Sequence, residues 1–183
     1  MFTNTQDYYW VFNNALSSDT CDKIIELGLS KKTFLARTHG YDLKKFKTLN
    51  KDQKNNLKKI RNSNVTFLDD KWLIDTLNNF VVKANINSGW KYQVDYSEKI
   101  QFTKYKKNQH YGFHRDSSIK DKGGDFEFQF RNSDDPSIIT PAPQLKNKGT
   151  IIVFPSFLYH RVTPLIKGTR YSLVMWTRGN LYW

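Results

Sequence analysis

Two histidines and one aspartate have the residue types and the spacing of a metal site. His114 and Asp116 lie two residues apart in a strand-like segment, and side chains at i and i+2 of a strand point to the same face. This pair alone is a weak signal, because it is common by chance. His160 adds a third ligand at the start of another strand-like segment. Two imidazoles and one carboxylate with open coordination positions form the ligand set of non-haem Fe(II) oxygenases, whereas zinc usually takes a further His or Cys.

An arginine after the third ligand extends this site. Arg170 follows His160 by ten residues, in the sequence Gly-Thr-Arg-Tyr-Ser-Leu. A guanidinium group presents a rigid fork that pairs with a carboxylate through two hydrogen bonds. On the strand after His160, Arg170 could hold one end of a dicarboxylic acid whose other end binds the metal. 2-Oxoglutarate has this geometry, so the sequence predicts a site for Fe(II) and 2-oxoglutarate.

These residues and their surroundings resemble the 2-oxoglutarate/Fe(II)-dependent dioxygenase superfamily. Within it, the similarity is to the prolyl 4-hydroxylase-like branch, which includes small bacterial and phage-type hydroxylases. The resemblance covers roughly residues 60–183 and is specific, because four separate elements occur in the right order. The elements read Tyr105-x8-His114-x-Asp116, then Gly149-x4-Phe154-Pro155-x4-His160-x-Val162-x-Pro164, then Arg170-Tyr171-Ser172.

The resemblance implies an enzyme that hydroxylates a substrate, with a peptidyl proline expected and with succinate and CO2 as products. It implies that His114, Asp116 and His160 are the iron ligands and that Arg170 binds the distal carboxylate of 2-oxoglutarate. It also implies O2 as a substrate and allows ascorbate as a further cofactor. The metal would carry the difficult chemistry, while the protein sets the ligand geometry and excludes water.

Further positions match the family less strictly. Tyr105, nine residues before the first ligand, matches a tyrosine that helps to hold the distal carboxylate. Tyr111 matches an aromatic position beside the metal, and Trp176 one on the substrate side. Ser172 could reach the cosubstrate from the Arg170 strand. Lys167 is an alternative partner for the carboxylate, but its place near a Gly-containing turn favours a solvent-facing role.

One stretch departs from the family pattern. Members of this branch usually have a core strand with an Arg-x-Leu-Ser motif between the His-x-Asp motif and a Gly-Gly-x-Phe strand. Here only residues 117–122 separate Asp116 from the Gly-Gly-Asp-Phe sequence at 123–126. Without that strand, two neighbouring strands would have exposed edges. The chain therefore either forms a minimised barrel or lacks a segment here, and the cost of exposed edges favours the second explanation.

The chain is strongly basic, with a formal net charge of +12 and a pI near 9.7, which can attract nucleic acid or acidic partners. Much of the excess lies in residues 44–61, where eight Lys and Arg accompany one acid, Asp52, and a solvated loop is expected. Two alternatives follow: an oxidative demethylase of nucleic acid, and a non-catalytic basic jelly-roll module that binds nucleic acid or an acidic partner. Demethylases of this superfamily usually carry a second Arg six residues after the first. Trp176 stands there, which argues against that activity.

Hydrophobic periodicity predicts helices that begin at Ser18 or Asp19 and near Asp69, with a weaker helix over 50–60. From residue 90 onward the chain reads as short strands separated by turn residues, and aromatic residues reach 15% of the composition, which favours β-structure. The expected strands are 8–12, 64–68, 91–96, 99–105, 111–116, 126–130, 150–154, 160–165 and 170–177. We predict one α+β, mainly β domain over 1–183: a double-stranded β-helix (jelly roll) over 90–183, with helices of the 1–89 region packed on one sheet.

The remaining features concern the compartment. Cys21 is the only cysteine, so neither an intramolecular disulfide nor a Cys-based zinc site is expected. The sequence shows no secretory signal and no run of about 18 apolar residues. We therefore predict a soluble, cytoplasmic protein without a membrane segment, and the sequence leaves its oligomeric state open.

Overall fold

The structure is a computed structural model that describes residues 8–36, 48–116, 127–129, 139–141 and 143–179. Its helices are α1 (Ser18–Ser30), α3 (Lys51–Ile60), α4 (Lys71–Asn87) and the short 3₁₀ helix η1 (Pro143–Lys146). The strands before Asp116 are β1 (Trp10–Phe12), β2 (Phe34–Leu35), β3 (Arg61–Asn62), β4 (Asn64–Leu68), β5 (Tyr96–Ser97), β6 (Ile100–Tyr105) and β7 (His110–His114). Those after it are β8 (Glu127–Gln129), β9 (Ile139–Pro141), β10 (Ile151–Val153), β11 (Tyr159–Val162), β12 (Arg170–Val174) and β13 (Thr177–Arg178).

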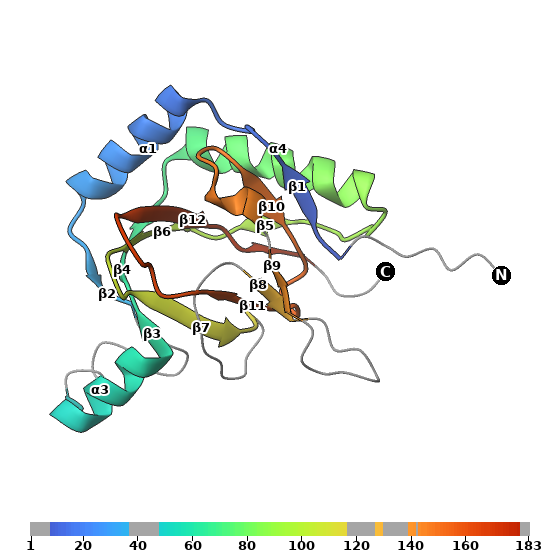
Figure 1. Ribbon diagram of the computed structural model, residues 1–183. Coiled ribbons are helices and arrows are strands. Elements are labelled where there is room, and N and C mark those ends of the chain that lie inside the picture. Colours follow the sequence, from blue (N-terminus) through green and yellow to red (C-terminus); the bar gives the residue numbers. More distant parts are fainter. Residues whose placement is uncertain (1–7, 37–47, 117–126, 130–138, 142, 180–183) are drawn as a thin grey trace, which may run out of the picture.

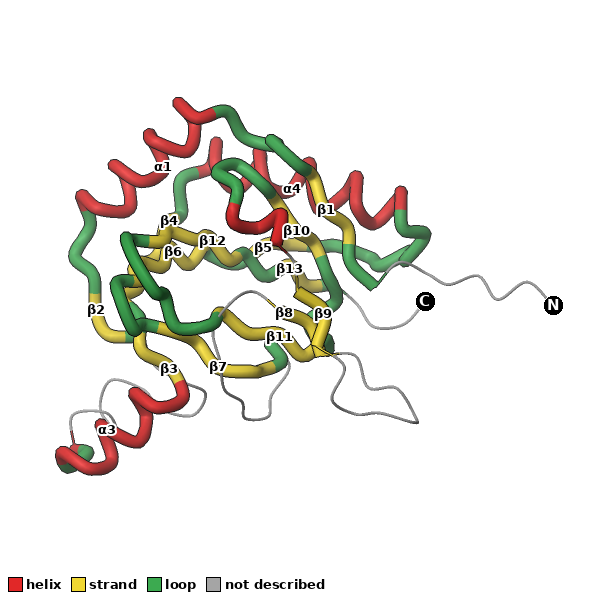
Figure 2. Tube along the Cα trace, viewed as in Figure 1, coloured by secondary structure: helices red, strands yellow, loops and turns green. Residues whose placement is uncertain are grey.

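Two antiparallel sheets form the body of the fold. One has the strand order β12-β6-β4-β2 and the other the order β3-β7-β11-β8-β9. The pairs β1–β10 and β13–β5 complete the strand set of the described residues. In Figures 1 and 2 the two sheets lie one above the other, with α1 and α4 beyond the four-stranded sheet and α3 beside β3. This arrangement confirms the predicted class, a mainly antiparallel β-structure with helices packed on one sheet.

Apolar faces hold the helices α1 and α4 against the sheet, and α1 also has a side-chain cap. Ser17 caps α1, because its hydroxyl accepts a hydrogen bond from the backbone N–H of Thr20 at 3.2 Å. The core between these helices and the four-stranded sheet consists of fully or almost fully buried apolar side chains, namely Ile24, Leu68, Leu73, Leu77, Ile100 and Phe102. This core packs against β6. The chain continues from β6 into β7, which ends at His114.

Close packing at Gly28 gives a first prediction. A Cβ atom at this position of α1 would lie 2.6 Å from ring atoms of Phe102, which is 1% exposed. We expect Gly28→Ala to destabilise the protein, because overpacking of this kind costs up to about 3 kcal/mol. The better helix propensity of Ala offsets only about 1 kcal/mol of this. Urea unfolding should show a net loss of about 2 kcal/mol.

The matched control is Glu26→Ala, an exposed position of the same helix. It should change the free energy of unfolding by no more than about 0.5 kcal/mol. A Gly28→Ala variant as stable as wild type would contradict the packing of α1 on β6.

The number of partners of each strand bears on the short stretch after Asp116. In the described part of the chain, β12 pairs only with β6, and β10 pairs only with β1. By contrast, β11 has a partner on both sides, β7 and β8. In the described part of the chain the histidine strand β11 thus keeps both neighbours, and the exposed edges expected from the sequence stay a prediction. Residues 117–126, which precede β8, lie outside the described residues.

Most predicted elements occur, but some strands are shorter than expected: β7 ends at His114, before Asp116, and β11 ends at Val162. The expected strand 91–96 is wrong, because its first five residues are irregular and only Tyr96 begins a short strand. The weak helix expected at 50–60 is well defined: Asn50 forms a capping box with Gln53, with hydrogen bonds of 2.9 and 3.0 Å in the two directions. The ends of the expected strand 126–130 lie outside the described residues. No helix in the described ranges has the length and apolar character to cross a membrane.

Candidate metal centre

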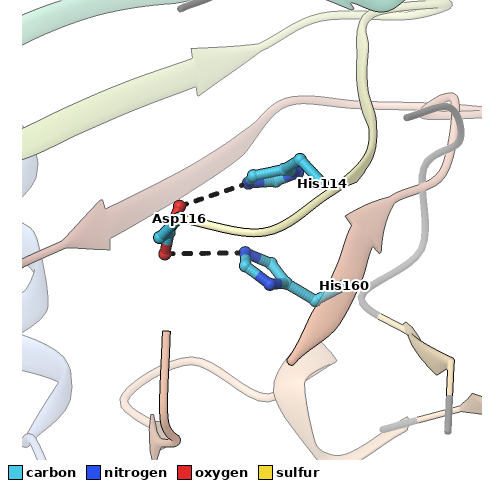
Figure 3. A group of neighbouring side chains, drawn as sticks. All are labelled: His114, Asp116 and His160. Carbon is cyan, nitrogen blue, oxygen red and sulfur yellow. Dashed lines mark ion pairs between the residues drawn. The ribbon is translucent and has the colours of Figure 1, made fainter. Parts of the chain in front are cut away.

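The two histidines lie side by side on paired strands. His114 ends β7 and His160 lies in β11, and the two residues are direct partners in the antiparallel pairing. Asp116 follows two residues after His114, where its backbone N–H donates to the carbonyl of Ser156 at 3.0 Å. That bond holds the residue against the segment that leads into β11. Figure 3 shows the Asp116 carboxylate facing both imidazole rings.

The distances between the three side chains suit a bound cation. The Nε2 atom of His114 lies 3.6 Å from Oδ1 of Asp116, and the Nε2 atom of His160 lies 3.8 Å from Oδ2. These separations are too long for good hydrogen bonds. They match ligands on separate sides of one ion, because metal–ligand bonds of about 2.0–2.2 Å place the ligand atoms roughly 3–4 Å apart. All three ligand atoms lie within 4.8 Å of one another, in the one such group among the described residues.

Backbone carbonyls hold both rings with Nε2 toward the centre. Nδ1 of His114 lies 2.7 Å from the carbonyl oxygen of Gly112, and Nδ1 of His160 lies 2.9 Å from that of Leu158. A carbonyl only accepts, so each Nδ1 carries the hydrogen and each Nε2 keeps its lone pair. This is the outer hydrogen bond that ligating histidines usually make.

Burial favours neutral imidazoles, which are the metal-binding form. His114 and His160 are 8% and 4% exposed. Burial, assisted by the nearby His160 and opposed by the hydrogen bond to Gly112, lowers the pKa of His114 to about 2. Burial also lowers the pKa of His160, although the charge of Asp116 acts in the opposite direction. Both rings are thus available as ligands at neutral pH without competition from protons.

Aromatic rings fix the orientation of the two histidines. The Tyr111 ring stacks on His114 with centroids 3.6 Å apart at 19°, and the Phe154 ring meets His160 edge-on at 4.8 Å. These two contacts restrict the rotation of the histidine rings. The site is therefore preorganised, as a metal centre requires.

Arg170 and Tyr105 lie on neighbouring strands of the other sheet. They are direct partners in the pairing of β12 with β6, and Tyr105 is 3% exposed. Burial raises the pKa of Tyr105, while the charges of Arg61 and Arg170 lower it. The tyrosine hydroxyl is thus neutral and lies in a positive environment that favours an anion.

One cavity of about 1660 Å³ joins the two groups. It is lined by all seven residues that the sequence predicted for the site: Tyr105, Tyr111, His114, Asp116, His160, Arg170 and Ser172. Trp176 and Thr150 line it as well. Typical small-molecule sites enclose about 300–1,000 Å³, and the pocket exceeds this range because its lining extends to core side chains such as Ile24, Leu77 and Phe102.

One lining residue was missed from the sequence. The solvated basic loop expected over 44–61 is wrong for Arg61, since this residue is 6% exposed and lies in β3 beside β7. The sequence carries no signal for its burial, because the residue ends a Lys-rich stretch. The other basic residues of α3 are exposed or half-exposed, as expected.

Other basic and histidine side chains lie outside the metal cluster. Lys167 is exposed, in agreement with the predicted solvent-facing role. Arg178 forms an ion pair with Glu98, and Arg161 stacks on the ring of Phe113. His110 contacts the backbone carbonyl of Lys59 at 3.0 Å, a structural contact outside the metal cluster. His39 lies outside the described residues.

No protein-family model and no curated protein matches the sequence. Solved structures match it over most of its length. A viral collagen prolyl hydroxylase of Paramecium Bursaria Chlorella virus-1 has a TM-score of 0.60 at 19% identity, covering 98% of this chain and 100% of that chain. A Pseudomonas putida prolyl-4-hydroxylase gives 0.64 at 14% identity, covering 94% and 93%.

A third match is a Trichoplax adhaerens prolyl hydroxylase, in complex with a peptide fragment of the hypoxia inducible factor oxygen degradation domain. It has a TM-score of 0.61 at 15% identity, covering 95% of this chain and 84% of that chain. At such identities the three matches establish the fold.

Proposed function

We propose that this protein is an Fe(II)- and 2-oxoglutarate-dependent dioxygenase that hydroxylates a peptidyl proline and releases succinate and CO2. The observation that carries the proposal is the placement of two groups in one cavity. A three-residue ligand set of two neutral imidazoles and one carboxylate lies on one side. An arginine paired with a buried tyrosine lies on the other. A metal chelator with a distal carboxylate would bridge these two groups.

Each residue has a definite part in this proposal. His114, Asp116 and His160 would hold Fe(II), which together with 2-oxoglutarate and O2 supplies the oxidising chemistry when bound. Arg170 would bind the distal carboxylate through its fork of donors. Tyr105 and Ser172 would donate hydroxyl hydrogen bonds to the same group. Tyr111 keeps the first histidine in its ligating orientation and shields it from water.

The fold matches support a peptide substrate. Three matched structures are prolyl hydroxylases, and one of them is a complex with a peptide fragment. We also propose that the two sheets form the walls of a jelly roll, and that the protein works in a reducing compartment such as the cytoplasm, as its single cysteine suggests. The use of ascorbate stays a prediction.

Two other functions receive less support. A demethylase of nucleic acid would need a second basic residue six positions after Arg170, where Trp176 stands and lines the cavity. A purely binding jelly-roll module has no need of buried, oriented imidazoles beside a carboxylate, because such polar groups are costly to bury without a ligand. The geometry therefore favours the enzyme.

Turnover with candidate peptides is the direct test. The protein is incubated with Fe(II), 2-oxoglutarate and a panel of proline-containing peptides, with methylated oligonucleotides alongside. We expect succinate to form in proportion to the gain of one oxygen atom on a peptide, measured by mass spectrometry. Oxidation of the oligonucleotides alone would select the demethylase. Failure of the wild-type protein to bind 2-oxoglutarate in the presence of metal would refute the proposed dioxygenase.

A further inference from the structure

The cavity contains a second buried arginine, Arg61, whose guanidinium group lacks a full set of partners. Arg61 lines the cavity and is 6% exposed. Its Nε donates to the hydroxyl of Ser63 at 3.2 Å, but its Nη2 atom is buried and makes no hydrogen bond with the described part of the protein. Burial of a charged donor without an acceptor is costly. An N–H left open in a cavity points to a ligand that accepts from it.

Arg61 lies between the two halves of the proposed site. Its guanidinium carbon is 4.1 Å from the centroid of the Tyr111 ring, the same ring that stacks on His114. It also acts on Tyr105: the charges of Arg61 and Arg170 both lower the pKa of that hydroxyl, against the rise caused by burial. Two guanidinium groups, from β3 and from β12, thus lie near one buried tyrosine hydroxyl.

The described residues supply no acid that forms an ion pair with Arg61. Asp116, the one carboxylate among the described residues that line the cavity, faces the two histidines, and no ion pair of Arg61 occurs within the described ranges. If Arg61 only packed against Tyr111, its buried Nη2 donors would have no acceptor. The positive charge is better balanced by an anion that enters the cavity.

We propose that Arg61 is a second carboxylate-binding residue, which donates from Nη2 to the distal carboxylate of 2-oxoglutarate beside the Tyr105 hydroxyl. The inference rests on the proposed function and adds to it a clamp of two arginines, Arg61 and Arg170. The ligand class is a 2-oxo acid with a second carboxylate. Arg61 approaches from β3, so the five-stranded sheet provides a cosubstrate contact besides the metal ligands.

The test is the binding of two 2-oxo acids to the Mn(II)-loaded protein by calorimetry. 2-Oxoglutarate carries the distal carboxylate, and 2-oxobutanoate lacks it. We expect Arg61→Gln to weaken 2-oxoglutarate binding about 10- to 100-fold, the usual size for a lost hydrogen bond to a charged group. Binding of 2-oxobutanoate and of Mn(II) should stay within about threefold of wild type, since neither uses the distal contact. Arg61→Lys keeps the positive charge but not the planar fork of donors. Its affinity for 2-oxoglutarate should therefore lie between those of wild type and Arg61→Gln.

Arg161→Gln is the matched control, because Arg161 also packs on an aromatic ring, 4.4 Å from the Phe113 centroid, but does not line the cavity. It should bind 2-oxoglutarate like wild type. If Arg61→Gln weakens both 2-oxo acids equally, or neither, the clamp is refuted while the dioxygenase stands. A wild-type protein that binds no 2-oxoglutarate refutes both proposals.

A wild-type measurement covers the case in which the Arg61 variants fail to fold. The guanidinium N–H signals of Arg61 in NMR spectra should shift, and their exchange with water should slow, when 2-oxoglutarate is added to the protein loaded with a diamagnetic metal such as Zn(II). The same addition of 2-oxobutanoate should leave them unchanged. Unchanged signals in both titrations would contradict a contact between Arg61 and the distal carboxylate.

Discussion

The Asp116→Ala variant is expected to bind Fe(II) or Mn(II) at least about 100-fold more weakly than wild type, because even the loss of an outer hydrogen bond to a metal ligand costs 10- to 100-fold. Asp116 is the single anionic member of the cluster and faces both imidazoles, at 3.6 and 3.8 Å. Without it, two neutral rings would have to hold a divalent cation alone. Succinate formation should fall below detection.

Metal binding can be measured apart from turnover. A ligand that binds only the folded state at 100 times its dissociation constant stabilises that state by about 2.7 kcal/mol. We therefore expect Mn(II) to raise the melting temperature of wild type and to leave that of Asp116→Ala unchanged. Asp75→Ala, which removes an exposed carboxylate from an ion pair with Lys71 on α4, is the control and should respond like wild type. If Mn(II) raised the melting temperature of Asp116→Ala as much as that of wild type, the metal would bind at another site.

The sequence predicted the ligand cluster because its geometry is local. The two-residue spacing keeps His114 and Asp116 close in the chain, although β7 ends at His114 and the backbone hydrogen bond from Asp116 to Ser156 holds the aspartate. The partner His160 required a long-range guess, namely that the strand carrying it lies beside the first. That guess depended on the resemblance to a known family, and the register of His160 with His114 agrees with it.

Arg61 could not be placed in the same way. Its charge and its position at the end of a Lys-rich stretch indicate a solvated residue, and only the tertiary pairing of β3 with β7 buries it. The strand expected at 91–96 failed for a similar reason. Alternation predicts extended structure, but a strand exists only where a partner edge is present, and the described pairing reaches only Tyr96 and Ser97.

The short stretch after Asp116 illustrates what a motif cannot show. The sequence predicts that two strands lose a neighbour, and because residues 117–126 lie outside the described residues, this stays a prediction. Within the described residues β11 has β7 on one side and β8 on the other, so the strand that carries His160 is paired along both edges.

The Arg170→Ala variant is expected to lose most of its affinity for 2-oxoglutarate while it keeps its metal affinity. Removal of one partner from a buried, hydrogen-bonded charge pair costs roughly 2–5 kcal/mol, which is about a 30-fold or greater rise in the dissociation constant. Arg170 is not a ligand, and it stands on β12 opposite Tyr105 rather than among the histidines. The Mn(II)-induced rise in melting temperature should therefore persist.

Lys167 provides the matched control for this prediction, because it is the alternative cationic partner and lines the same cavity, but is exposed. Lys167→Ala should bind 2-oxoglutarate within about threefold of wild type, since exposed charge pairs contribute no more than about 1 kcal/mol. A large loss in Lys167→Ala together with normal binding in Arg170→Ala would transfer the carboxylate site to the lysine. Comparable losses in Arg170→Ala and Arg61→Gln would agree with a clamp in which both arginines bind the carboxylate.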